Sequence, residues 1–264
     1  MKLSQLERVL GELFPLKNAL RDDRTGLQVN CGNIDINSID IAYELNDDVI
    51  DECISNNSQL LLVFHPLIYR KLESVNIDER VGKLLIKLIR NDISLYVVHT
   101  IYDTNPKGTN YHIAKKLGLN KISNLIDIFP ENDIGMGFVG EFESEISLND
   151  LLLKCKDIFC SPIKYTNGKS NFIRRIAIVG GSGSSFADEI FDKDIDAFIT
   201  ADNTYHTFHR FKDKIALIDP GHYEMEKFVV DGIYEFLNQN PLINGISLNK
   251  SNIDTNPVNY YIEN

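Results

Sequence analysis

The stretch Leu60-Leu61-Leu62-Val63-Phe64-His65-Pro66 combines two features that decide how this chain folds and where it could do chemistry. Five apolar residues in a row are typical of a strand buried on both faces of a parallel or mixed sheet. Pro66 favours an extended backbone at His65. We therefore expect an imidazole at the carboxyl end of a buried strand, which is where open α/β sheets bind ligands.

Outward from this strand, short apolar runs alternate with amphipathic segments, which is the pattern of α/β proteins. The predicted strands are residues 39–45, 60–64, 95–98, 135–142, 176–179, 197–200 and 215–218. The predicted helices are residues 3–13, 47–53 (capped by Asp47 and Asp48), 79–90, 111–117 (ending at Gly118), 148–159 and 224–237. The sequence thus predicts an α/β fold with mixed sheets flanked by helices.

The alternation of apolar runs and amphipathic segments begins again after Leu125. Residues 121–134, which connect the two parts of the chain, form a short segment that is not of low complexity. A length of 264 residues fits one large domain or two modest ones. We expect two packed domains: a metal-binding α/β domain of residues 1–125 with 222–264, and a second α/β domain of residues 126–221.

The composition, 43% hydrophobic and 25% charged, is that of an ordinary globular chain. The net charge of −11 argues against nonspecific binding to nucleic acids or anionic membranes, but is compatible with a small anionic substrate held locally. No apolar run reaches the roughly 18–20 residues of a membrane span, and the first residues lack a signal-peptide core. Four sparse cysteines without a Cys-x-x-Cys pair are expected to be reduced structural thiols. These features predict a cytoplasmic protein.

Titratable side chains follow three of the predicted strands. His65 follows the strand at residues 60–64. His99 ends the strand at residues 95–98, and Asp103 lies four residues further on. His222 follows the strand at residues 215–218, and Glu226 lies four residues further on. Residues four apart on a helix share one face, so His222 and Glu226 could hold one ion or two neighbouring ones.

Imidazoles and carboxylates without thiolates suit divalent zinc, iron, manganese or nickel. Two such ions about 3.5–4 Å apart could polarise a substrate oxygen and generate hydroxide near neutral pH. The competing interpretation is structural, because a single histidine after a strand is commonly a hydrogen-bonded core residue. The metal hypothesis depends on the three strand ends taken together, as ends of one sheet.

Two weaker patterns remain. The run Gly180-Gly181-Ser182-Gly183-Ser184-Ser185 could cradle an anion, but a plain strand-to-helix turn explains it as well, since it matches neither nucleotide-binding fingerprint. His206 and His209, three residues apart, suggest one helix face. They are candidates for metal ligands or, more in keeping with their position, for substrate contact or proton transfer, a catalytic role that we assign to His206.

Seven motifs occur in one order along the chain. They are Gly26-Leu27-Gln28-Val29; Phe64-His65-Pro66-Leu67-Ile68-Tyr69; His99-Thr100-Ile101-Tyr102-Asp103 with Gly108-Thr109-Asn110; Gly180-Gly181-Ser182-Gly183; Thr200-Ala201-Asp202 with His206; Gly221-His222-Tyr223 with Glu226; and Asp254-Thr255-Asn256-Pro257. Together they resemble the GTP cyclohydrolase 1 type 2-like proteins, also called interacting-factor-three-like dinuclear-metal proteins, along almost the whole chain.

The resemblance implies two interlocked α/β domains, a toroidal homo-hexamer and a dinuclear metal site facing its interior. It implies that His65, Asp103, His222 and Glu226 are metal ligands, with Glu226 bridging and His99 a ligand or a close partner of one. The implied function is a metal-dependent hydrolase acting on GTP or another nucleotide-like or phosphorylated small molecule.

The chain departs from the pattern of this family in two places. The family's Trp-Asp-Asn near the start is absent and is replaced around Asp22-Asp23-Arg24, and a histidine of the implied metal site is missing. The family usually has His-His-Pro where this chain has Phe64-His65-Pro66, and phenylalanine cannot bind a metal. We therefore expect one ion per chain, or two if His99 fills the vacated position. The departure also motivates an alternative function, a non-catalytic ring-forming binding protein with a degenerate metal site.

Overall fold

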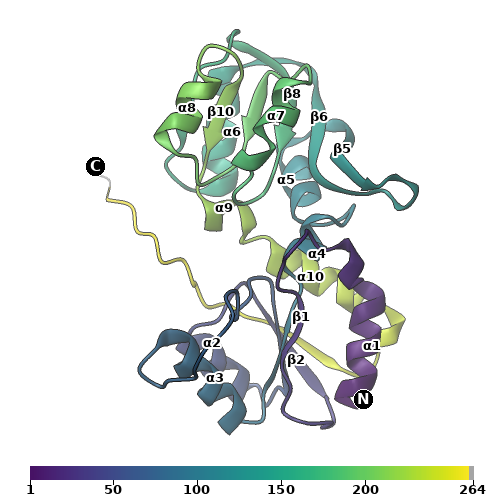
Figure 1. The fold of residues 1–264 in the computed structure, drawn as a ribbon. Helices are drawn as coiled ribbons and strands as arrows, with labels where there is room; N and C mark the ends of the chain where they lie inside the picture. The colour runs from purple at the N-terminus through teal and green to yellow at the C-terminus, as the bar shows by residue number, and fades with distance from the viewer. Residues whose placement is uncertain (262–264) are drawn as a thin grey trace. The chain divides into compact units, whose positions relative to one another are not determined.

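The computed structural model describes residues 1–261 of the chain (Figure 1). Backbone contacts divide the chain into two compact units. Unit 1 comprises Met1–Tyr102 and Val229–Pro257, and unit 2 comprises Asp103–Phe228 and, among the described residues, 258–261. The domain limits predicted from the sequence, near residues 125 and 221, stay a prediction.

Unit 1 contains a five-stranded mixed sheet. Its strands are β1 (Gly26–Val29), β2 (Ser38–Ala42), β3 (Leu60–Val63), β4 (Ser94–Val97) and β11 (Ser247–Lys250), in the order β1-β4-β3-β2-β11. β1 is antiparallel to β4, and the other neighbours are parallel. The helical segments are α1 (Leu3–Leu13), η1 (Leu16–Asn18), α2 (Asp47–Ser55), α3 (Arg80–Arg90), α4 (His99–Asp103, which ends one residue into unit 2), α10 (Val229–Asn238) and η4 (Pro241–Ile243).

Helices cover both faces of this sheet, which explains why β2, β3 and β4 are buried along their whole length. In Figure 1, α2 and α3 lie on one face, and α1 and α10 on the other. The first face forms a core in which Val49 and Leu88 pack with Leu61 and Val97. Because both faces of the sheet are shielded from solvent, the sequences of these strands are continuous apolar runs.

Unit 2 contains a six-stranded mixed sheet. Its strands are β5 (Asn120–Phe129), β6 (Ile134–Ser147), β7 (Lys164–Thr166), β8 (Phe172–Ile178), β9 (Ala197–Ile199) and β10 (Ala216–Asp219), in the order β5-β6-β8-β9-β10-β7. The helical segments are α5 (Thr109–Leu117), η2 (Pro130–Asn132), α6 (Leu148–Phe159), η3 (Ser184–Phe186), α7 (Ala187–Phe191), α8 (Tyr205–Phe211) and α9 (His222–Glu226).

Successive side chains of the central strands of unit 2 point to opposite faces of the sheet and pack into a hydrophobic core on each face. Ala197 and Ile199 of β9 pack with Leu151 of α6 in one core. Phe198, between them, faces Phe211 of α8, with ring centroids 5.8 Å apart. This alternation follows from the two-residue period of a strand, and it confirms the predicted α/β fold with mixed sheets flanked by helices.

Two details differ from the predicted elements. The helix predicted at residues 224–237 is two helices, α9 and α10, because the chain passes from unit 2 to unit 1 between Phe228 and Val229. The cap of α2 is Asn46, whose side chain accepts a hydrogen bond from the backbone of Val49, while Asp47 and Asp48 lie in the first turn. In the described part of the chain, no helix is both long and apolar enough to cross a membrane.

Candidate metal site

Two of the predicted site residues meet in unit 1. Val63 and Val97 are paired in register on the parallel strands β3 and β4, so the residues after them leave the sheet side by side. The imidazole rings of His65 and His99 lie with centroids 5.4 Å apart and nearly perpendicular. The expectation that three strand ends of one sheet carry the site residues holds for these two histidines only; for His222 it is wrong, because His222 follows β10 of the other sheet.

Asp23 holds the ring of His99. Its Oδ1 lies 2.6 Å from His99 Nδ1, and its Oδ2 accepts hydrogen bonds from the backbone and hydroxyl of Thr100. Burial alone would raise the pKa of Asp23, but these hydrogen bonds lower it to about 2. An ionised carboxylate only accepts, so the proton is on Nδ1 and any metal coordination by this ring would use Nε2.

Phe64 occupies the centre of the aromatic cluster of unit 1. Its ring is fully buried, with its centroid 6.0 Å from that of Tyr43, 5.2 Å from His65 and 5.6 Å from His99. The Tyr43 hydroxyl lies 3.5 Å from His65 Nε2. A phenyl ring therefore fills the space beside both histidines.

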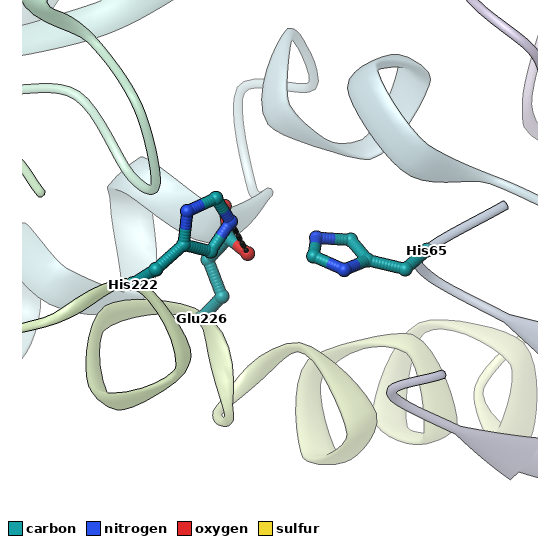
Figure 2. Close-up of side chains that lie close together, drawn as sticks. All are labelled: His65, His222 and Glu226. Atoms are coloured by element: carbon teal, nitrogen blue, oxygen red, sulfur yellow. Dashed lines mark ion pairs between the residues drawn. The ribbon is translucent and has the colours of Figure 1, made fainter. Parts of the chain in front are cut away.

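In unit 2, α9 carries His222 and Glu226 on one face, as the spacing predicted. Figure 2 shows the imidazole and the carboxylate turned toward each other, with His222 Nε2 2.9 Å from Glu226 Oε2. Asp202 lies on the other side of the ring, with its Oδ2 2.6 Å from His222 Nδ1. Burial by itself would lower the pKa of His222, yet the hydrogen bonds to Asp202 and Glu226 raise it to about 10.

Gly181 makes room for this pair. Its φ is +61°, and a Cβ atom there would lie 2.1 Å from Glu226 Oε1 and 3.2 Å from Cε1 of His222. The backbone N–H groups of Gly180 and Gly183 donate to Asn110 Oδ1 and Thr200 Oγ1. The glycine run is therefore a tight turn packed against a carboxylate, which favours the turn interpretation over an anion cradle.

Asp103 is held at the same turn. Its Oδ1 accepts a hydrogen bond of 2.6 Å from the Thr109 hydroxyl, and its backbone carbonyl accepts one of 3.2 Å from Asn110 Nδ2. Asn110 also accepts from Gly180, so one amide side chain connects Asp103 to the turn that Glu226 contacts. Within unit 2, Gly181 thus packs against His222 and Glu226, and Asp103 is connected to the same turn only indirectly, through Asn110.

A buried aspartate fixes the two segments that carry Asp202 and His222. Asp219, at the end of β10, accepts hydrogen bonds from the backbone N–H groups of Asn203 (3.2 Å) and Gly221 (3.1 Å). Its carboxylate also lies 2.9 Å from the Lys164 ammonium. The backbones next to the imidazole and next to its carboxylate partner are therefore held by one side chain.

His206 lies in the first turn of α8 and is exposed. Its ring centroid is 5.7 Å from that of Tyr205, which is itself 72% exposed. Thr204 caps the helix by accepting a hydrogen bond from the backbone of Thr207. A histidine so placed can exchange protons with solvent or contact a ligand.

Sequence reasoning missed Asp23 and Asp202 as partners of the two histidines. A carboxylate on the far nitrogen of an imidazole is the usual companion of a metal-ligating histidine, since it fixes the ring and its tautomer. Asp202 belonged to a quoted motif, but nothing in the spacing links Asp23 to His99, 76 residues away. The oriented pair of His222 Nε2 and Glu226 Oε2 has the donor chemistry to hold a metal ion.

The chain is similar to proteins of one family over nearly its full length. A family model described as Duf34/NIF3 (NGG1p interacting factor 3) matches residues 1–257. The GTP cyclohydrolase 1 type 2 homolog of Clostridium acetobutylicum is 30% identical over 229 residues, which cover 86% of this chain and 85% of that protein. The homolog of the same name in Ureaplasma parvum is 31% identical over 262 residues, 95% of each. The crystal structure of the Staphylococcus aureus hypothetical protein SA1388 matches with a TM-score of 0.89 and 26% identity, covering 99% of each chain.

Proposed function

Because the chain belongs to the Duf34/NIF3 family, we propose that it is a metal-dependent hydrolase acting on a nucleotide-like or otherwise phosphorylated small molecule. The proposed metal ligands are His65, Asp103, His222 and Glu226, with His99 as a further ligand or as a close neighbour of one. The names of the related proteins make GTP the first substrate to test.

The observation that carries this proposal is the pair on α9. His222 Nε2 and Glu226 Oε2 converge to 2.9 Å, Glu226 is only 4% exposed, and Asp202 holds the far side of the imidazole. In the absence of a metal, the position between two carboxylates is occupied by a protonated imidazole. A divalent cation in place of that proton would add one positive charge beside the carboxylates of Asp202 and Glu226. Nitrogen and oxygen donors without thiolate suit zinc, iron, manganese or nickel.

A divalent ion in this site would lower the pKa of a water molecule and polarise a substrate oxygen. The chain itself supplies orientation: Asp202 and Asp23 would fix the rings of His222 and His99. His206, exposed at the start of α8, is proposed to contact the substrate or to carry a proton to solvent.

Elemental analysis of the purified, metal-loaded protein tests the proposal. We expect Glu226→Ala to lose bound transition metal, and the matched variant Glu189→Ala, on an exposed turn of α7, to keep it. GTP turnover should be lost with the metal. A wild-type protein without bound transition metal, or an unchanged metal content in Glu226→Ala, would contradict the proposal.

A specific observation favours a second candidate, a non-catalytic ring-forming binding protein. Phe64 fills the space beside His65 and His99 with an apolar ring. If Phe64→His raises the metal content from about one to about two ions per chain and switches on GTP turnover, the natural protein is a degenerate enzyme. Robust turnover by the unmodified chain would eliminate this candidate.

Both candidates include assembly into a homo-hexamer in the cytoplasm, as the family resemblance and the composition led us to expect. Light scattering on the purified protein measures the mass of the assembly, and a monomer at micromolar concentration would contradict this part of the proposal. All four cysteines are free thiols in the structure, which agrees with a reducing compartment.

A further inference from the structure

The segment that follows His65 is a long loop whose first end is clamped. Residues 64–79 form no helix or strand. Gln28 on β1 binds both backbone groups of Ile68, accepting from its N–H (2.9 Å) and donating to its carbonyl (3.1 Å). Arg24 Nε donates to the carbonyl of Tyr69 at 3.2 Å. Gln28, a residue of one of the quoted motifs, thus has the role of fixing the start of this loop.

The other end of the loop is fixed at Asn76. Its side-chain and backbone oxygens accept hydrogen bonds from the N–H groups of Asp78 and Glu79, both at 3.1 Å. Gly82 of α3 packs directly on it, since a Cβ atom at Gly82 would lie 2.0 Å from the Asn76 carbonyl oxygen. Both stems are therefore held by the body of unit 1.

The middle of the loop, residues 70–75, is not fixed by polar contacts in the described part of the chain. Among the described residues, no hydrogen bond or ion pair involves residues 70–75, and all six are exposed. Arg70 and Lys71 are thus two cations without a carboxylate partner, in a chain with a net charge of −11. Tyr69, beside them, is 60% exposed. Loops of this length without secondary structure are uncommon in compact units and are usually either functional or disordered linker segments; here both stems are held by hydrogen bonds.

We propose that residues 69–75 form a recognition loop for a nucleoside phosphate, in which Arg70 and Lys71 bind phosphate oxygens and the Tyr69 ring stacks on the base. A guanidinium and an ammonium are the side-chain groups that bind phosphate, and exposed aromatic rings stack on bases. Tyr69 follows His65 by four residues, so at most about 14 Å of extended chain separates the two Cα atoms. This inference rests on the proposed function and assigns the part of the chain that selects its substrate.

Trypsin tests the position of the ligand. Because trypsin cleaves after arginine and lysine, we expect the first cut of the metal-loaded protein after Arg70 or Lys71. GTP should slow this cut.

Binding measurements test the role of the side chains. The double variant Arg70→Gln/Lys71→Gln should bind GTP and pyrophosphate at least about tenfold more weakly, since it loses two charge-assisted contacts. The matched control is Arg8→Gln/Lys17→Gln, which removes the same two charges from exposed positions of unit 1 and should bind both ligands like the wild type. Tyr69→Ala should weaken GTP binding and leave pyrophosphate binding unchanged. Metal content should stay at the wild-type level in every variant.

The outcomes separate this inference from the proposed function. If the wild type binds GTP and the Arg70→Gln/Lys71→Gln variant binds it equally well, the recognition loop is refuted while the proposed function stands. If the metal-loaded wild type binds neither GTP nor pyrophosphate, the recognition loop is refuted, and the proposed function is then decided by the metal content of the wild type and of Glu226→Ala. An equal loss of affinity in the Arg8→Gln/Lys17→Gln control would also refute the loop, because net charge alone would then explain the effect.

Discussion

Gly181→Ala should separate metal binding from folding. A Cβ atom at this position would lie 2.1 Å from Glu226 Oε1, whereas nonbonded heavy atoms prefer about 3.5 Å, so the carboxylate must retreat by roughly 1 Å. Metal–ligand distances vary by only about 0.2 Å, so a shift of the whole carboxylate by this amount would carry Oε2, the oxygen that faces His222, out of a coordination shell. Because the loss of even an indirect partner weakens metal binding about 10- to 100-fold, we expect at least a 100-fold loss of affinity.

The expected effect of Gly181→Ala on stability is small. The atom that must move is the end of a side chain, and the remaining cost is that of an alanine at a φ of +61°, about 1–2 kcal/mol. Gly118→Ala is the matched control, because Gly118 has a φ of +78° and no atom within 4 Å of its added Cβ. Its backbone strain is therefore the same, without the contact to Glu226.

Urea unfolding and competition with a metal chelator measure the two effects of these glycine variants. We expect both variants to lose similar free energy of unfolding and only Gly181→Ala to lose metal affinity. A Gly181→Ala protein that binds metal like the wild type would refute the assignment of Glu226 as a ligand. A parallel loss of affinity in Gly118→Ala would attribute the effect to backbone strain instead.

Three further predictions concern the groups around the two histidines. Asp23→Asn should lower the free energy of unfolding by about 2 kcal/mol at pH 7, since the pKa of Asp23 is lowered from 3.8 to about 2; the difference from the wild type in urea unfolding should shrink as the pH falls from 4 toward 2, and a difference independent of pH would contradict this origin. In the metal-free protein, an NMR titration of His222 should have its midpoint near pH 10 and a lower midpoint in Asp202→Asn. The stability that His222 contributes should be complete below about pH 6.5 and be lost as the pH rises toward 10; a midpoint near 6.5 would show that the two carboxylates do not hold its charge. Phe64→Ala should cost about 3–5 kcal/mol in urea unfolding, because its ring is fully buried; a cost below 1 kcal/mol would show that the ring is not packed as described.

Local pattern was enough to predict most of the helices and central strands. The predicted helices at residues 3–13 and 148–159 coincide with α1 and α6, because their apolar spacing and their ends are set by nearby residues. The pair of His222 and Glu226 could be predicted for the same reason, since four residues on one helix fix which side chains meet. Four strands, β1, β5, β7 and β11, were not predicted. They lie at the edges of the two sheets, and β5, β7 and β11 have exposed side chains and therefore no continuous apolar run.

The chain by itself thus determined which side chains could do chemistry and which ends of strands carry them, because strand burial and helix periodicity are properties of short segments. Only the tertiary structure decided which carboxylates hold the imidazoles. Asp23 reaches His99 across 76 residues and Asp202 reaches His222 across 20, and no local period encodes such distances. The same holds for Gly181, whose need to be glycine comes from the Glu226 carboxylate packed against it. Contacts of this kind depend on how separate segments pack, which is why they appear only once the chain has folded.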